Sequence, residues 1–254
     1  MFRLLILLLA LMLLPACSMA EAPAPLTFTD DLTGVYTWPE GSSEAEASYV
    51  YRYTYPQIAG DSELALTINE VFRYEADDAV GFECPMNASA HDPALGQMEV
   101  IIAYEIVHLS DEFLSVRVDK QVTVGETASS VVKGYSFMLT GVEAGTVTSL
   151  PYLLGVIDPE DTDEWYLDRQ TAKADACARD LVWMRIEQDM KAEGSPIYED
   201  MTFEEFEWGF YPEEDFYLDA EGNFVFFLQE GMIAPVEDGQ FFYAIPLDEL
   251  LDEI

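Results

Sequence analysis

Hydrophobic and polar residues follow two spacings along this chain, and each spacing predicts one kind of element. Residues 47–58 (ASYVYRYTYPQI) alternate, with tyrosines at every second position, which predicts a half-buried strand. Gly60-Asp61-Ser62 ends that strand and caps a helix, whose apolar residues recur at helical spacing as far as Ala79. Residues 83–97, which contain two prolines, are expected to form a loop.

Alternation returns in the middle and at the end of the chain. Three strands are predicted at residues 98–109, 112–124 and 129–139, with breaks short enough for hairpins, so they should form an antiparallel meander. The longest helical pattern covers residues 169–193. The remaining predicted elements are a short helix at 203–208, strands at 214–218, 223–229 and 240–246, and a terminal helix at 247–254. This order predicts an α+β, two-lobed fold with antiparallel sheets, one helix after the first strand and a longer helix before the C-terminal strands.

The first seventeen residues have the layout of a secretory signal. Arg3 is basic, residues 4–14 are apolar, and Leu14-Pro15-Ala16-Cys17 ends the run with small residues. The run is shorter than the roughly 20 residues that span a membrane. It resembles the lipobox of bacterial lipoproteins, which implies a signal peptide over residues 1–16, lipidation of Cys17 and a tether over 17–25. The alternatives are an ordinary cleaved signal and a buried apolar helix.

The charge of the chain is strongly acidic. Lys and Arg number 11 against 49 Asp and Glu, a net charge of −38, yet half of the residues are apolar and 13% are aromatic. The chain is therefore expected to be globular. An acidic surface repels nucleic acid and anionic lipid and attracts basic proteins, so we expect no nucleic-acid partner and membrane attachment through the lipid alone. The alternative is that the charge serves solubility.

Few residues have spacings typical of catalytic or metal chemistry. His91 and His108 lack the spacing of zinc ligands, and we expect neither a metal site nor a cofactor. The acidic residues 158–164 could bind calcium, although a solvated charge run fits them better. Trp165, Trp183 and Trp208 could stack on sugars, or pack in a core or an interface. Cys84 and Cys177 form an even pair in an exported chain, which predicts a disulfide; the alternative is two buried thiols.

Two stretches carry a resemblance to a known family. The first is Tyr55-Pro56-Gln57-Ile58-Ala59-Gly60, followed by a helix with Ile68-Asn69. The second is residues 216–251, with Phe216-Tyr217-Leu218, a turn, Phe224-Val225-Phe226-Phe227 and a loop through Pro235 and Gly239. Together they resemble the paired exported domains of the RsiV-like family, DUF4163 followed by DUF3298. The resemblance implies a DUF4163-like lobe over residues 26–145 and a DUF3298-like lobe over 146–254.

The resemblance also implies a function. That family includes the extracellular region of a lysozyme-sensing anti-sigma factor and a module of some peptidoglycan deacetylases. We therefore expect a lipid-anchored, non-catalytic binding domain of the cell envelope, outside the cytoplasm, whose partner is a basic protein such as a lysozyme-like muramidase, or peptidoglycan.

The loop between the last two strands is the predicted place of contact with a partner. Its residues Ile233, Pro235, Val236 and Gly239 could touch a partner or form a structural turn; Val236 stands where the family usually has an aromatic residue. Two alternative functions stay open: an envelope glycan hydrolase that uses a carboxylate pair, and a structural lipoprotein of an envelope complex.

Overall fold

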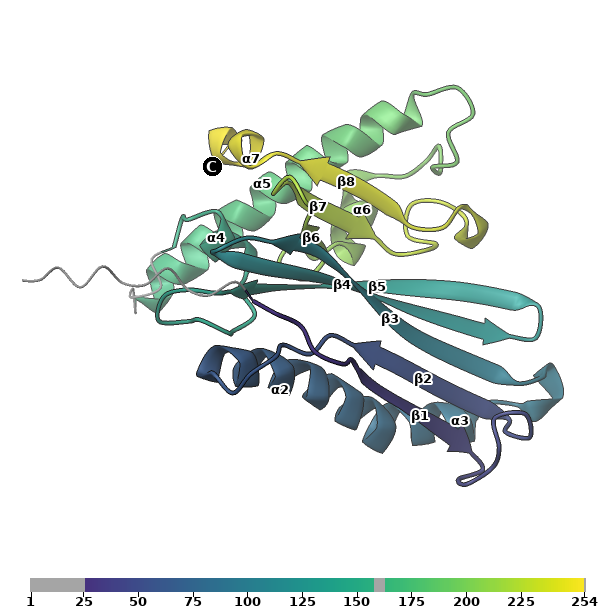
Figure 1. The fold of residues 1–254 in the computed structure, drawn as a ribbon. Helices are drawn as coiled ribbons and strands as arrows, with labels where there is room; N and C mark the ends of the chain where they lie inside the picture. Colours follow the sequence, from purple (N-terminus) through teal and green to yellow (C-terminus); the bar gives the residue numbers. More distant parts are fainter. Residues whose placement is uncertain (1–25, 158–162, 254) are drawn as a thin grey trace, which may run out of the picture.

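The strands form two separate sheets in the computed structural model, which describes residues 26–157 and 163–253 (Figure 1). The larger sheet has the order β1 (Leu32–Trp38), β2 (Tyr49–Tyr55), β3 (Met98–Leu109), β4 (Phe113–Val124) and β5 (Thr127–Met138). The smaller sheet contains β6 (Phe216–Leu218), β7 (Phe224–Leu228) and β8 (Phe241–Ile245), all antiparallel. The predicted α+β fold is confirmed. The predicted signal peptide, Cys17 and the tether lie outside the described residues.

One pairing in the larger sheet differs from the prediction of antiparallel sheets. β2 pairs parallel with β3, with Tyr49 opposite Met98. The helical segment between them crosses over and returns the chain to the same end of the sheet, which is the connection that parallel strands require. β1, which the sequence pattern did not predict, pairs antiparallel with β2, so the first predicted strand is the second of the sheet.

The helical segment that makes this crossover is longer than predicted. α2 (Glu63–Asp78) is capped by Ser62, whose Oγ accepts a hydrogen bond from the N–H of Ala65. It continues through a π-helical turn, η1 (Ala79–Glu83), into α3 (Cys84–Ala90), and a 3₁₀ turn, η2 (Pro93–Leu95), follows. The predicted loop over residues 83–97 is therefore wrong as far as Ala90. Pro85 lies in the first turn of α3, directly after the wider π-helical turn. A proline is tolerated at this position of a helix.

The motif Ile58…Asn69 has a structural explanation. The Asn69 side chain accepts a hydrogen bond from the N–H of Ile58 at 2.7 Å and donates one to its carbonyl at 2.9 Å. Both backbone groups of the segment that leaves β2 are thereby satisfied by the helix that follows it. This pair of bonds fixes the start of α2 against the end of the strand.

The C-terminal half is organised around one long helix. α5 (Glu164–Met190) confirms the predicted long helix and starts earlier than expected, because Asp163 caps it. The shorter helices are α4 (Leu150–Leu153), α6 (Phe203–Gly209), the 3₁₀ turn η3 (Val236–Asp238) and α7 (Leu247–Glu253). Within residues 26–157 and 163–253, no helix combines the length and the hydrophobicity needed to cross a bilayer.

Two large hydrophobic clusters hold the layers together. One lies between α2 and the larger sheet and includes Tyr51, Phe72 and Phe137. The other lies between α5 and the smaller sheet and includes Val182 and Phe226. In Figure 1 the order of layers is therefore α2, larger sheet, smaller sheet and α5. Each cluster draws its buried residues from one predicted lobe, while the domain boundary at residue 145 stays a prediction.

The two sheets contact each other directly. A small cluster of Val132, Tyr217, Val225 and Phe227 lies between them. The side chain of Gln229 bonds both backbone groups of Val132, at 3.1 and 2.8 Å. The N–H of Leu218 in β6 also donates to the buried Ser115 Oγ of β4 at 3.0 Å. The two halves of the chain are thus joined by hydrogen bonds as well as by apolar packing.

The predicted disulfide between Cys84 and Cys177 is wrong. Cys84 is fully buried in the cluster under α2, whereas Cys177 belongs to the cluster under α5. Burial raises the pKa of the Cys84 thiol to about 11, so it stays protonated. The Cys177 thiol donates to the carbonyl of Leu250 at 3.3 Å. Both cysteines therefore serve as small core residues, and an even cysteine count alone did not indicate their positions.

Candidate functional site

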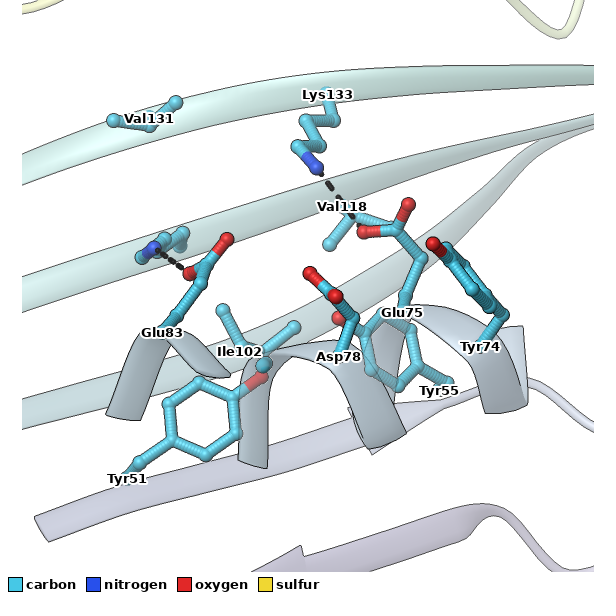
Figure 2. Close-up of a pocket in the computed structure, with 12 residues that line it drawn as sticks. Tyr51, Tyr55, Tyr74, Glu75, Asp78, Glu83, Ile102, Val118, Val131 and Lys133 are labelled. Carbon is cyan, nitrogen blue, oxygen red and sulfur yellow. Dashed lines mark hydrogen bonds and ion pairs between the residues drawn. The ribbon is translucent and has the colours of Figure 1, made fainter. Parts of the chain in front are cut away.

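A pocket of about 130 Å³ lies between the helical segment and the larger sheet (Figure 2). α2 and η1 form one wall, and β4 and β5 form the opposite wall. Its floor consists of the rings of Tyr51 and Tyr55 with the aliphatic side chains of Ile102 and Val118. The floor is part of the core, because alternate residues of β2, β3 and β4 point toward α2.

The walls of the pocket carry opposite charges. On the sheet side, Lys120 Nζ lies 3.0 Å from Glu83 Oε2 and Lys133 Nζ lies 3.1 Å from Glu75 Oε2. Figure 2 shows Asp78 on the helix between these two ion pairs. The ion pairs cross the pocket from helix to sheet, so they connect its two walls.

Tyr51, Tyr55 and the nearby Tyr135 stay protonated near neutral pH. Burial raises the pKa of Tyr55 to about 12, and burial together with the neighbouring Tyr55 raises that of Tyr51 further. Burial and the carboxylate of Glu75 also raise the pKa of Tyr135. The floor therefore offers neutral hydroxyl groups and ring surfaces, and the formal charge of the pocket comes from its walls.

The pocket does not have the arrangement that a glycosidase needs. Its three carboxylates, Glu75, Asp78 and Glu83, all come from the helical wall, and lysines occupy the facing wall. A glycosidase places two carboxyl groups on either side of a sugar ring. This pocket therefore lacks the facing carboxyl pair that glycoside hydrolysis requires.

The predicted contact loop is only partly accessible. Ile233 is fully buried in the cluster under α5, and its carbonyl accepts a hydrogen bond from the N–H of Tyr198 at 3.0 Å. Its assignment as a contact residue is therefore wrong, because the smaller sheet needs it as core. Val236 is exposed, Pro235 and Gly239 are half-buried, and Gly239 has a φ of 77°, which favours glycine.

An exposed aromatic surface lies beside this loop on α6. Trp208 has 77% of its surface exposed, and with Tyr211, Glu204 and Glu207 it lines a shallow groove, which we call the α6 surface. Met232 packs against Gly209, which places the loop next to this surface. Helical spacing could have indicated the exposure, because Phe203 and Phe206 of the same short helix, with Phe210 directly after it, occupy the buried side.

The three tryptophans considered for sugar stacking have different surroundings. Trp183 packs against Phe203 and Phe206, with ring centroids 5.8 and 5.6 Å apart, which confirms core packing for this residue. Trp165 is 69% exposed on α5, next to Arg169, and Trp208 is exposed on α6. Core packing is therefore wrong for the latter two.

The histidines lie apart and bind backbone. His91 contacts the carbonyl of Gly96, and His108 contacts that of Asp219, each at 2.8 Å. In the part of the chain that the structure describes, no three His, Cys, Asp or Glu side chains are grouped as metal ligands. Residues 158–162 of the acidic run considered for calcium lie outside that part.

Solved structures show what this chain resembles. No protein-family model and no curated protein matches the sequence. A crystal structure of a DUF3298 family member from Bacteroides fragilis is similar with a TM-score of 0.52 and 13% identity, over 92% of this chain and 95% of that chain. A DUF3298 family protein from Pseudomonas aeruginosa is similar with a TM-score of 0.50 and 12% identity, over 91% and 95%. The chain shares the fold of these DUF3298 family proteins. At this identity the likeness concerns the fold, and the resemblance to DUF4163 stays a prediction.

Proposed function

We propose that this protein is a lipid-anchored, non-catalytic binding domain of the bacterial cell envelope and that its partner is a basic protein of the lysozyme-like muramidase class. The observation that carries the proposal is the α6 surface, where Trp208 and Tyr211 are exposed between carboxylates. Tryptophan and tyrosine are enriched among the residues that dominate binding energy in protein interfaces. An exposed tryptophan next to acidic groups fits a partner that presents basic and apolar groups together.

The charge of the whole chain supports the same class of partner. A net charge of −38 accelerates the approach of a basic protein and slows that of an acidic one. Such steering weakens with salt, since the Debye length falls from about 30 Å at 0.01 M to about 3 Å at 1 M. Salt dependence is therefore the property that separates this partner from a neutral glycan.

Trp208→Ala is expected to weaken lysozyme binding about tenfold, because a truncated aromatic anchor loses its buried contact area. The matched control is Trp165→Ala, which removes another exposed tryptophan far along the chain on α5. Binding of the full chain in mild detergent to immobilised lysozyme is measured at low and at high salt. If the parent chain does not retain lysozyme at low salt, lysozyme is not the partner. If the two variants bind lysozyme with equal affinity, the α6 surface is not the binding site. If peptidoglycan retains the chain equally at low and high salt, the partner is the glycan and not lysozyme.

The lipid anchor is tested separately at Cys17. Cys17→Ala is expected to release the protein from the membrane fraction or leave it with its first 16 residues attached, because no thiol is left to accept the lipid. Cell fractionation and the mass of the mature chain measure both results. A processed Cys17→Ala chain that stays in the membrane fraction would contradict the lipoprotein proposal.

A further inference from the structure

The pocket between α2 and the larger sheet has one carboxylate more than its lysines neutralise. Lys120 is paired with Glu83 and Lys133 with Glu75. Asp78 lines the same pocket, and its carboxylate makes no hydrogen bond or ion pair with any residue that the structure describes. Because each lysine is already engaged, the negative charge of Asp78 lacks a counter-charge within the pocket.

The size and floor of the pocket limit what can enter it. Its volume of about 130 Å³ is close to the roughly 150 Å³ of a protein cavity that holds one benzene molecule. This admits a short alkyl chain, whereas a disaccharide is too large. Ile102, Val118 and the ring of Tyr55 provide the apolar surface on which methylene groups can pack.

We propose that this pocket binds an organic cation, namely an ammonium or guanidinium group on a short alkyl chain. The charged end lies at Asp78 between the two ion pairs, and the alkyl chain lies on the apolar floor. Tyr74, exposed at the helical wall, also lines the pocket. An anion would have to break a lysine pair and approach Asp78, so the arrangement disfavours it. The site is separate from the α6 surface and does not depend on the proposed function.

Calorimetric titration of the full chain in mild detergent tests the charge preference. The probes are n-butylammonium, n-butylguanidinium, n-butanol and butyrate, which share one alkyl chain and differ in the head group. We expect heat of binding for the two cations and none for the alcohol or the carboxylate. Binding of butyrate, or equal binding of butanol and butylammonium, would overturn the proposal. N-acetyl-lysine amide then distinguishes two sources of the cation. If it binds, the natural ligand is a protein side chain; if it is excluded, the natural ligand is a free amine.

A matched pair of variants locates the site. Asp78→Asn is expected to weaken butylammonium binding about two- to fivefold, which lies within the range measured for exposed ion pairs. Asp77→Asn removes the same charge from the preceding helical position, which is exposed like Asp78 but does not line the pocket, and should leave the affinity unchanged. Equal affinities of Asp78→Asn and the parent chain would overturn the assignment. The far-UV circular dichroism of both variants shows that α2 is intact.

Discussion

Gly134→Ala is expected to lower the free energy of unfolding by about 3 kcal/mol or more, because it forces an atom into the contact between the two sheets. Gly134 lies in β5, and a Cβ at this position would come within 1.8 Å of the carbonyl oxygen of Phe216 in β6. The obstacle is backbone, which cannot rotate away as a flexible side chain would. The strands must separate, and the bonds that join Leu218 and Gln229 to the larger sheet should weaken with them.

Urea unfolding measures this effect, and Gly81→Ala is the matched control. A Cβ on Gly81 meets no atom within 4 Å, and the residue lies inside the helical segment. Alanine there is expected to leave the protein equally stable or stabilise it by up to about 1 kcal/mol. If both variants unfold at the same urea concentration as the parent chain, the close approach of β5 and β6 is not required for stability.

The second large effect concerns pH and a buried carboxyl group on α5. Asp175 is 9% exposed, and its Oδ1 has no hydrogen-bond partner among the described residues. Burial raises the pKa of Asp175 to about 6, the charge of Glu213 contributes to the rise, and Arg179 opposes it. An unfolded aspartate has a pKa of about 3.9. Since the folded chain prefers the protonated form, Asp175 destabilises the protein as the pH rises from about 4 through 6.

Asp175→Asn should therefore raise the free energy of unfolding near pH 7 by on the order of 2 to 3 kcal/mol, and should have little effect at pH 4. The control is Asp180→Asn, which removes one negative charge from an exposed position of the same helix. Urea unfolding of both variants at pH 4 and pH 7 measures the difference. A variant Asp175→Asn that is no more stable at pH 7 than Asp180→Asn would show that the aspartate is not buried as a charge in the folded chain.

Local patterns predicted most helices and strands, because each is an amphipathic segment with a clear period. The long helix α5 and the strands of the meander are examples, and their spacing needs no tertiary information. The sequence pattern did not predict β1 because it is an edge strand of mostly half-exposed residues with a glycine, Gly34, near its centre. The segment 83–90 was predicted as a loop because it contains Pro85, which in the folded chain lies in the first turn of a helix.

Tertiary contacts decided the features that the sequence did not predict. The parallel pairing of β2 with β3 leaves no trace in alternation, which is the same for both strand directions. The pocket combines residues from Tyr51 to Lys133, and no local pattern connects them. The even number of cysteines predicted a bond between Cys84 and Cys177. The two residues lie in different clusters because α3 and α5 pack in different parts of the fold. The α6 surface, in contrast, lies within the short segment 204–211 and was accessible to sequence reasoning.

The parallel pair also has a consequence for the order in which the sheet assembles. β3, β4 and β5 are joined by short turns, so they can pair through contacts between near neighbours. β2 reaches β3 only after the whole segment from Ile58 to Gln97 has been folded back, and closing so long a loop costs conformational entropy. We therefore expect the meander to form first and the hairpin of β1 and β2 to be added to it last.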